Sequence, residues 1–221
     1  NVTKYDATFS ITPATVNVTG VTLNKTSWTY DGTYATITGI TTDKTITGIT
    51  FSYKYTFYKK DANGDYQSVS GADEMSDITD AGAYKVVVTL VSATANANGL
   101  SNYVAGDEAE KEFTISQKDI TDKTGDAFDF TITHTYNGKD NYDNPINLVY
   151  TGSVFSGNSY NVTVKYGNTT LDADDCTITI TGVDKAGNNV TEVKNAGTYT
   201  ITVTGKGNYT GTRNEITFTV D

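Results

Sequence analysis

Apolar and polar side chains alternate along several segments of this chain. In residues 198–204, Tyr199, Ile201 and Val203 stand between four threonines. The same two-residue period runs through residues 51–57 and 160–166. Because successive side chains of a β-strand point to opposite faces, each segment predicts a strand with one apolar and one polar face. Such strands form antiparallel sheets, which bury their apolar faces against each other.

The composition excludes an all-helical protein. Thr makes up about a fifth of the 221 residues, whereas Met occurs once. Helices favour unbranched side chains, and β-branched Thr, Val and Ile suit the pleated surface of a sheet. Apolar residues make up 37% of the chain, which is enough to build a buried core.

The net charge of −10, from 16 basic and 26 acidic side chains, excludes one class of partner. Nucleic-acid binding needs clustered Lys and Arg, and Arg213 is the only arginine. An anionic membrane surface would repel the chain, and no apolar stretch is long enough to insert. We therefore expect neither nucleic acid nor membrane insertion in this segment.

The chain also repeats itself at a spacing of about 105 residues. Residues 9–11, 113–115 and 218–220 read Phe-Ser-Ile, Phe-Thr-Ile and Phe-Thr-Val. Asn-Tyr at 102–103 recurs at 208–209. Such a period is the mark of tandem modules.

A third landmark of the repeat is Tyr-Asp-Gly at 30–32, which we match to Tyr-Asn-Gly at 136–138. We predict two modules, 13–116 and 117–221. Residues 1–12 end in the closing-strand motif, so we expect them to be the closing strand of a preceding module or an extra N-terminal strand.

A fourth landmark lies before the penultimate strand of each module. Residues 80–84 read Asp-Ala-Gly-Ala-Tyr, and residues 195–199 read Asn-Ala-Gly-Thr-Tyr. In immunoglobulin-like sandwiches a tyrosine here hydrogen-bonds back to the nearby backbone and fixes the corner. The sequence therefore predicts an all-β protein of two tandem immunoglobulin-like antiparallel β-sandwiches. The residues to which we assign this structural role are Gly82, Tyr84, Gly197 and Tyr199.

Several segments resemble repeats of bacterial surface proteins. Residues 18–26 (Val-Thr-Gly-Val-Thr-Leu-Asn-Lys-Thr) are similar to the opening of group 2 bacterial Ig-like domains of intimin- and invasin-like proteins. Residues 30–33, 196–203 and 208–211 resemble the YDG and MBG repeats of bacterial surface adhesins. This resemblance implies secreted or surface-anchored tandem arrays that serve as stalks or adhesive modules, with no catalytic residues.

Acidic residues are the candidates for a metal site. Four carboxylates near one predicted strand could supply oxygen ligands to calcium, the only cofactor we consider. Solvated turn acids are the alternative. A second run, Asp-Ala-Asn-Gly-Asp at 61–65, lacks the later EF-hand positions and carries the Asn-Gly signal of a hairpin turn. The calcium candidates are Asp172, Asp174, Asp175 and Asp184.

Catalytic candidates are few. His134 is the only histidine, and its strand parity places it on an apolar face. Cys176 is the only cysteine and leads an apolar strand face, where a small core residue is expected. A Cys–His nucleophile pair is formally available, but no nucleophile motif surrounds either residue. We expect no enzyme activity.

Trp28 is the candidate for ligand binding. Its indole could stack on a sugar, or it could belong to the core or the strand rim. The leading interpretation is a stalk of a secreted or cell-surface protein of a Gram-positive bacterium. It would space and present a distal domain, and its partners would be neighbouring modules. The alternative is a module that binds carbohydrate or a host protein through loop ends and exposed aromatic residues.

Overall fold

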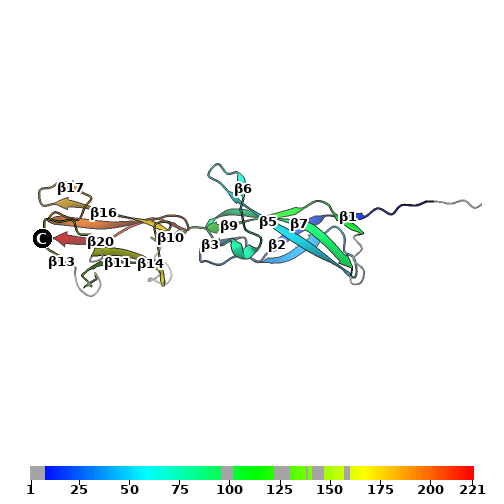
Figure 1. Cartoon of the computed structure of the whole chain (residues 1–221), viewed down its shortest axis with the longest axis horizontal. Helices are drawn as coiled ribbons and strands as arrows, with labels where there is room; N and C mark the ends of the chain where they lie inside the picture. Colours follow the sequence, from blue (N-terminus) through cyan, green and yellow to red (C-terminus); the bar gives the residue numbers. More distant parts are fainter. Residues whose placement is uncertain (1–7, 96–101, 122–129, 138, 141–146, 157–159) are drawn as a thin grey trace, which may run out of the picture. The chain divides into compact units, whose positions relative to one another are not determined.

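The computed structural model describes residues 8–95, 102–121, 130–137, 139–140, 147–156 and 160–221. Within these residues the regular elements are β-strands and one short 3-10 helix, η1 (Met75–Asp77) (Figure 1). The all-β class predicted from the alternation is therefore confirmed. The chain divides into two compact units, Asn1–Ser116 (unit 1) and Gln117–Asp221 (unit 2).

Unit 1 has a large sheet in the order β3-β9-β7-β5-β6, a smaller sheet of β2 and β4, and the pair β1–β8. The long strand β5 shows the predicted two-residue period from Ile49 to Tyr55, and the Asn-Gly turn at 63–64 joins β5 to β6. The strands are β1 (Ala14–Val16), β2 (Val18–Leu23), β3 (Ser27–Thr29), β4 (Ile37–Thr42), β5 (Ile49–Lys60), β6 (Tyr66–Ser68), β7 (Gly82–Ala95), β8 (Tyr103–Ala105) and β9 (Ala109–Ser116).

Unit 2 has sheets in the orders β13-β20-β18-β16-β17 and β12-β11-β14-β15, and the pair β10–β19. The strands are β10 (Lys118–Asp119), β11 (Phe130–Tyr136), β12 (Lys139–Asp140), β13 (Asn147–Leu148), β14 (Tyr160–Tyr166), β15 (Thr169–Thr170), β16 (Cys176–Asp184), β17 (Asn189–Val190), β18 (Gly197–Gly205), β19 (Tyr209–Thr210) and β20 (Thr212–Val220).

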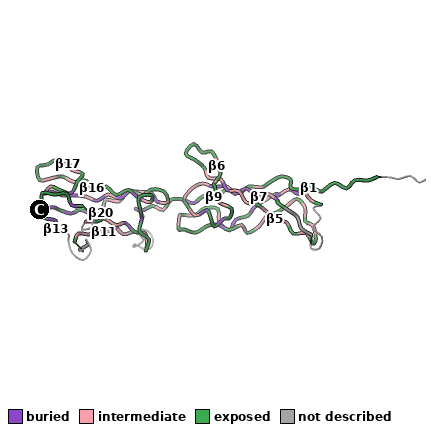
Figure 2. Tube along the Cα trace, viewed as in Figure 1, coloured by how far each residue is buried: buried purple, intermediate pink, exposed green. Residues whose placement is uncertain are grey.

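The core of each unit lies between its sheets. In unit 1, Val21 and Leu23 from β2 belong to the same buried cluster as Phe57, Val86 and other residues of the large sheet. Figure 2 shows the buried residues along the strands in purple. Along β18, and in the second half of β9, they recur at every second position, whereas Val86, Val87 and Val88 of β7 are all buried. In β18, Tyr199, Ile201 and Val203 are at most 1% exposed, and threonines occupy the positions between and beside them. Burial of these alternating faces stabilises the fold.

One feature of the sheets was not predicted from the sequence. Most neighbours are antiparallel, but the short opening strands pair parallel with strands near the end of their unit. These parallel pairs are β1–β8, β3–β9, β10–β19 and β13–β20. The first strand of each unit, β1 or β10, thus runs parallel to the strand that directly precedes the closing strand, β8 or β19.

The match of residues 30–32 to 136–138 is also wrong. In unit 1, Trp28 of β3 pairs with Ile115, and the amide of Tyr30 donates to the carbonyl of Ser116 over 2.8 Å. The same geometry in unit 2 belongs to residues 148–150. There the amide of Tyr150 donates to the carbonyl of Asp221 over 2.8 Å.

The true counterpart of Tyr-Asp-Gly-Thr at 30–33 is therefore Tyr-Thr-Gly-Ser at 150–153. Gly32 and Gly152 adopt φ of 75° and 78°, so the same left-handed turn follows both tyrosines. Of the segment matched from sequence, Tyr136 ends β11, and Gly138 lies outside the described residues. The interval between the opening strand and this turn is longer in unit 2, with 30 residues from Ile120 to Tyr150 against 14 from Val16 to Tyr30, and this difference misled the match.

The N-terminal segment forms no strand where the structure describes it, at residues 8–13. Of the two expectations for residues 1–12, an extra strand of this chain therefore does not hold for residues 8–12. The other expectation, a closing strand of a preceding module, stays a prediction.

Candidate functional site

The tyrosines that open β7 and β18 form the same corner in both units. The hydroxyl of Tyr84 donates to the carbonyl oxygen of Asp80 over 3.0 Å, and that of Tyr199 donates to the carbonyl oxygen of Asn195 over 2.8 Å. Both bonds reach back four residues, and each joins a tyrosine to the nearby backbone as the sequence predicts. A buried hydroxyl needs such a partner, so each bond ties the loop to the first residues of the strand.

The closing strand packs on this corner through its phenylalanine. Phe113 of β9 stacks on Tyr84 with ring centroids 5.4 Å apart and an interplanar angle of 15°. Phe218 of β20 stacks on Tyr199 at 5.4 Å and 16°. Two of the repeated sequence landmarks, the corner tyrosine and the phenylalanine of the closing strand, therefore pack against each other in the same way in both units.

The glycines two residues before these tyrosines differ in their surroundings. A Cβ on Gly197 would overlap the backbone carbonyl oxygen of Val183 and lie 2.7 Å from the Cα of Asp184. At Gly82 the corresponding neighbours are the end of the Lys59 side chain and, at 2.9 Å, the ring of Tyr84. The end of a lysine side chain can move aside, whereas the paired backbone of β16 cannot. Of these two glycines, therefore, only Gly197 is required by close backbone packing.

We predict that Gly197→Ala lowers the free energy of unfolding of unit 2 by about 2–4 kcal/mol, because β16 and β18 must separate to admit the methyl group. Gly82→Ala is the matched control and should cost unit 1 about 1 kcal/mol or less. Chemical denaturation of both variants measures the difference. Equal losses in the two units would contradict the assignment of Gly197 to backbone packing.

The four calcium candidates do not form one site. Asp172, Asp174 and Asp175 precede β16, whereas Asp184 ends it. The eight residue steps of an extended strand separate the two ends by about 26 Å, much farther than one ion can bridge. Among the residues that the structure describes, no group of three or more His, Cys, Asp or Glu side chains could hold a metal ion.

The same acids are engaged in turns of the backbone. A carboxylate oxygen of Asp172 accepts the amide of Asp174 over 2.8 Å. Asp184 accepts the amides of Asn188 over 2.8 Å and Ala186 over 3.0 Å. These hydrogen bonds to Asn188 and Ala186 hold the pKa of Asp184 below its usual value. A carboxylate that accepts the amide two residues later forms an Asx turn. Asp172 and Asp184 both have this geometry.

We predict that Ca²⁺ leaves the stability of unit 2 unchanged. A site filled to a hundred times its Kd would add about 2.7 kcal/mol, which is readily measured. Thermal unfolding in Ca²⁺ and in EDTA, with Asp172→Asn as the test variant and Asp184→Asn as the control, checks this. A stabilisation by Ca²⁺ that only Asp172→Asn removes would revive a site at the 172–175 turn.

Trp28 lies on the core of unit 1 and is not an open platform. Its ring stacks parallel to that of Phe113, with centroids 6.0 Å apart and an interplanar angle of 6°. The ammonium of Lys25 lies 4.2 Å from the ring centroid. Because Trp28 pairs with Ile115 as Leu148 pairs with Val220, the position is that of a fully buried leucine in unit 2. The structure therefore favours the core interpretation over the ligand-binding one.

We expect acrylamide to quench Trp28 fluorescence several-fold less in the folded chain than in denaturant. The half-buried indole lies between Lys25 and Phe113, so the quencher reaches little of the ring. Stern–Volmer constants measured with and without denaturant check this. Equal constants would show that the ring is open to solvent, and a titration with sugars would then be warranted.

His134 and Cys176 are both buried in unit 2. His134 is 0% exposed and lies among aromatic rings, 5.0 Å from Tyr160 and 4.4 Å from Phe218 by centroid distance. Burial lowers the pKa of His134 to about 4, so the ring is neutral at pH 7. Burial also raises the pKa of the Cys176 thiol, which opposes a nucleophilic role. These are the core positions that strand parity predicts for both residues.

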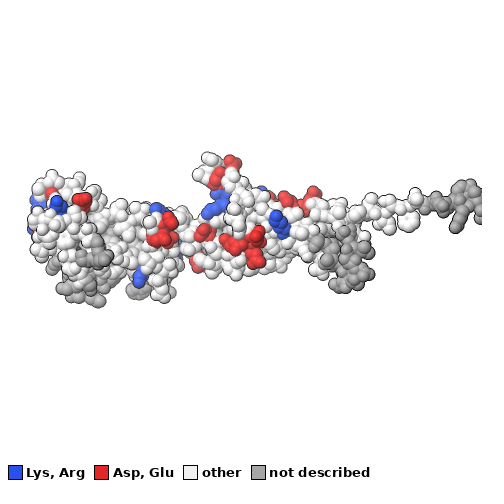
Figure 3. Space-filling view, viewed as in Figure 1, with Lys and Arg blue, Asp and Glu red and all other residues white. Residues whose placement is uncertain are grey.

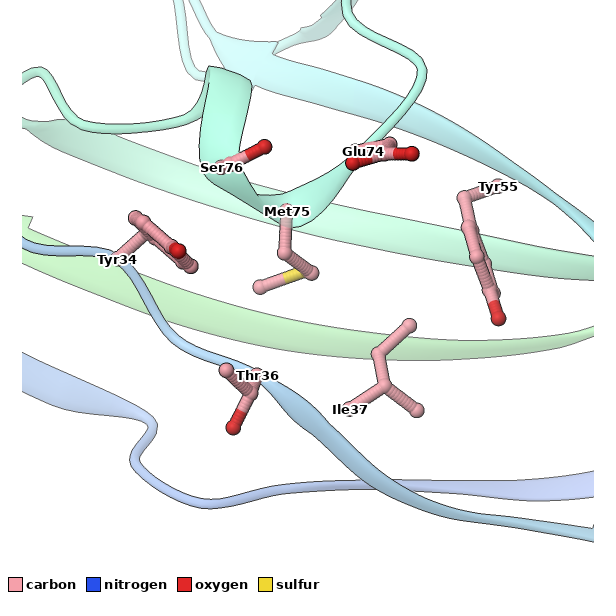
Figure 4. A pocket seen from close by; sticks show the side chains of 7 residues that line it. All are labelled: Tyr34, Thr36, Ile37, Tyr55, Glu74, Met75 and Ser76. Atoms are coloured by element: carbon pink, nitrogen blue, oxygen red, sulfur yellow. The ribbon is translucent and has the colours of Figure 1, made fainter.

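A pocket that the sequence did not indicate lies in unit 1, between η1 and the segment that leads into β4. It encloses about 280 Å³. Figure 4 shows Tyr34 and Tyr55 on opposite sides of it, with Met75 between them and Glu74 on the side of η1. The lining residues are Tyr34, Thr36, Ile37, Tyr55, Glu74, Met75 and Ser76. Residues 34–37, 55 and 74–76 are far apart in sequence, so no local motif could have revealed the pocket.

The pocket offers aromatic and hydroxyl groups but one carboxylate, that of Glu74. A second hollow, in unit 2, lies between Thr181, Asn189 and Thr200 and has no titratable side chain in its lining. Both hollows are lined largely by hydroxyl-bearing and apolar side chains.

The charged groups form no extended patch on the face that Figure 3 shows, where uncharged side chains cover most of the described surface. No helix in the described part of the chain is long and apolar enough to cross a membrane. Comparison of the chain with protein-family models and with curated proteins finds no match.

Proposed function

We propose that this chain is a non-catalytic, load-bearing part of a secreted or cell-surface bacterial protein. Its two units would be tandem immunoglobulin-like modules that space and present a distal functional domain. The resemblance of residues 18–26, 30–33 and 196–203 to repeats of surface proteins supports this proposal. The proposal is also supported by the carboxylates of Asp172 and Asp184, which accept backbone amides in turns.

The observation that carries the proposal is the parallel pairing of each unit's first strand, β1 or β10, with the strand that leads into its closing strand, β8 or β19. The amide of Ala14 donates to the carbonyl of Asn102 over 2.8 Å, and that of Lys118 donates to the carbonyl of Asn208 over 2.9 Å. Tension applied through the ends of a unit pulls such strands past each other along their length. Several backbone hydrogen bonds then bear the load together, whereas a strand peeled from its end loses them one by one.

Single-molecule stretching of the whole chain tests this. We expect two force peaks, each releasing about 350 Å of chain for about 100 residues. Lys118→Pro should lower the peak of unit 2 alone, because proline has no amide hydrogen to donate. Lys118→Ala retains the amide and is the matched control. If both variants unfold at the force of the unsubstituted chain, the parallel pair bears no load and the proposal fails.

Binding of carbohydrate is a second candidate, supported by the pocket between Tyr34 and Tyr55. Aromatic rings stack on the apolar faces of sugars, and the nearby hydroxyl and carboxylate groups can bind sugar hydroxyls. A glycan array with the unsubstituted chain and with Tyr34→Ala checks this candidate. Binding that Tyr34→Ala abolishes and Trp28→Phe leaves intact would support it. A blank array for the unsubstituted chain would count against it.

A further inference from the structure

Residues 9–16 correspond one by one to residues 113–120. Phe-Ser-Ile in the first stretch answers Phe-Thr-Ile in the second, and Val16 answers Ile120 at the same spacing of 104 residues. In the second stretch, residues 113–115 belong to β9, which closes unit 1, and residues 118–119 form β10, which opens unit 2. The stretch thus spans the end of one unit and the start of the next.

The second half of this correspondence holds in the structure. Val16 and Ile120 are 0% and 1% exposed. They end or directly follow β1 and β10, which pair parallel with β8 and β19. Ala14 and Lys118 donate equivalent amide hydrogen bonds, to Asn102 and Asn208. Residues 14–16 therefore open unit 1 as residues 118–120 open unit 2.

The first half differs in its burial and in its secondary structure, since residues 9–11 form no strand and residues 113–115 belong to β9. Phe113 and Ile115 are 2% and 1% exposed, because β9 lies in the large sheet and its phenylalanine stacks on Tyr84. Phe9 and Ile11 are 87% and 84% exposed (Figure 2). The corresponding places in unit 1 and unit 2 are already taken by β9 and β20. Phe9 and Ile11 thus have the sequence pattern of a closing strand, but their side chains are exposed and are not packed in a core.

We propose that residues 9–11 are a closing strand for another unit of the same type, one that is open where β9 closes unit 1 and β20 closes unit 2. Phe9 would stack on the corner tyrosine of that unit, and Ile11 would enter its core beside the opening strand. The intervening Ser10 would face solvent, as Thr114 does in β9. This inference goes beyond the load-bearing function and does not depend on it.

A chain ending at residue 211 tests the proposal, because it lacks β20 and leaves Tyr199 without its closing strand. Cys176 is the only cysteine and is 4% exposed in the closed unit, so its reaction with a thiol reagent reports whether unit 2 is closed. A peptide of residues 4–12 should slow this reaction at least about tenfold, as should a peptide of the natural strand, residues 213–221. The 4–12 peptide carrying Phe9→Asp and Ile11→Asp is the matched control and should give no protection.

Protection by the 213–221 peptide without protection by the 4–12 peptide would overturn the proposal, and so would equal protection by the control peptide. If no peptide closes the truncated unit, a graft decides. In this variant a copy of residues 4–12 replaces residues 213–221 in the full chain, with the same graft carrying Phe9→Asp as its control. Slow Cys176 reaction in the graft and fast reaction in its control support the proposal. Equal reaction rates in the two grafts would overturn it.

Discussion

Replacing Tyr199 by alanine is expected to lower the free energy of unfolding of unit 2 by about 3–5 kcal/mol while unit 1 keeps its stability. Tyr199 is 0% exposed, stacks on Phe218 and donates a hydrogen bond from its hydroxyl to the carbonyl of Asn195. Alanine would remove the ring, the stacking and the hydrogen bond together. For a domain of this size, whose total stability is about 5–15 kcal/mol, this loss is a large fraction.

The chain carries its own probe for each unit, so this loss can be assigned. Trp28, the only tryptophan, reports on unit 1, and Cys176, the only cysteine, reports on unit 2. Tyr199→Ala should shift the denaturation midpoint seen by Cys176 reactivity and leave the midpoint seen by Trp28 fluorescence unchanged. Tyr84→Ala is the reciprocal variant and should do the reverse. A shift in both midpoints for either variant would mean that the two units do not unfold independently.

The stability of unit 2 is expected to fall by up to about 3 kcal/mol as the pH is lowered from 6.5 to 4. Burial lowers the pKa of His134 to about 4 in the folded chain, against 6.5 in an exposed histidine. Between these values the unfolded chain binds a proton that the folded chain does not, so acid favours unfolding. Above pH 6.5 both states are neutral at this residue, and its contribution is constant.

His134→Leu removes the titrating group from a site of similar size. Its free energy of unfolding should therefore vary much less over this pH range, whatever its value at pH 7. Denaturation followed by circular dichroism at several pH values measures the slope, and Trp28 fluorescence identifies the transition of unit 1. An unchanged slope in the variant would show that another group is responsible.

Strand parity predicted which side chains of the long strands are buried, because that information is local. It placed Tyr199, Ile201 and Val203 in the core of unit 2 and put His134 and Cys176 on buried faces. The hydrogen bond of the corner tyrosine could also be predicted from the sequence, because the tyrosine and the carbonyl that it binds are only four residues apart. What parity cannot supply is the partner of a strand, and the parallel pairs of β3 and β13 were missed for this reason.

The candidate sites show the same limit. Asp184 was grouped with Asp172 because both lie near one strand in sequence, although an extended strand carries its two ends far apart. The place of Trp28 became clear only through the register that equates it with Leu148. The pocket of Tyr34 and Tyr55 is made by segments separated by turns and strands, and no spacing rule links them.

The direction of the strands has a consequence for how such a gene can change. In each unit the first strand runs parallel to the strand that leads into the closing one. In the tandem array that we propose, duplicating or deleting the coding segment of one unit would therefore leave the course of the chain through the other units unaltered. Selection could then lengthen or shorten such an array in steps of about 105 codons, the spacing of the repeated landmarks, without any compensating mutation in a core.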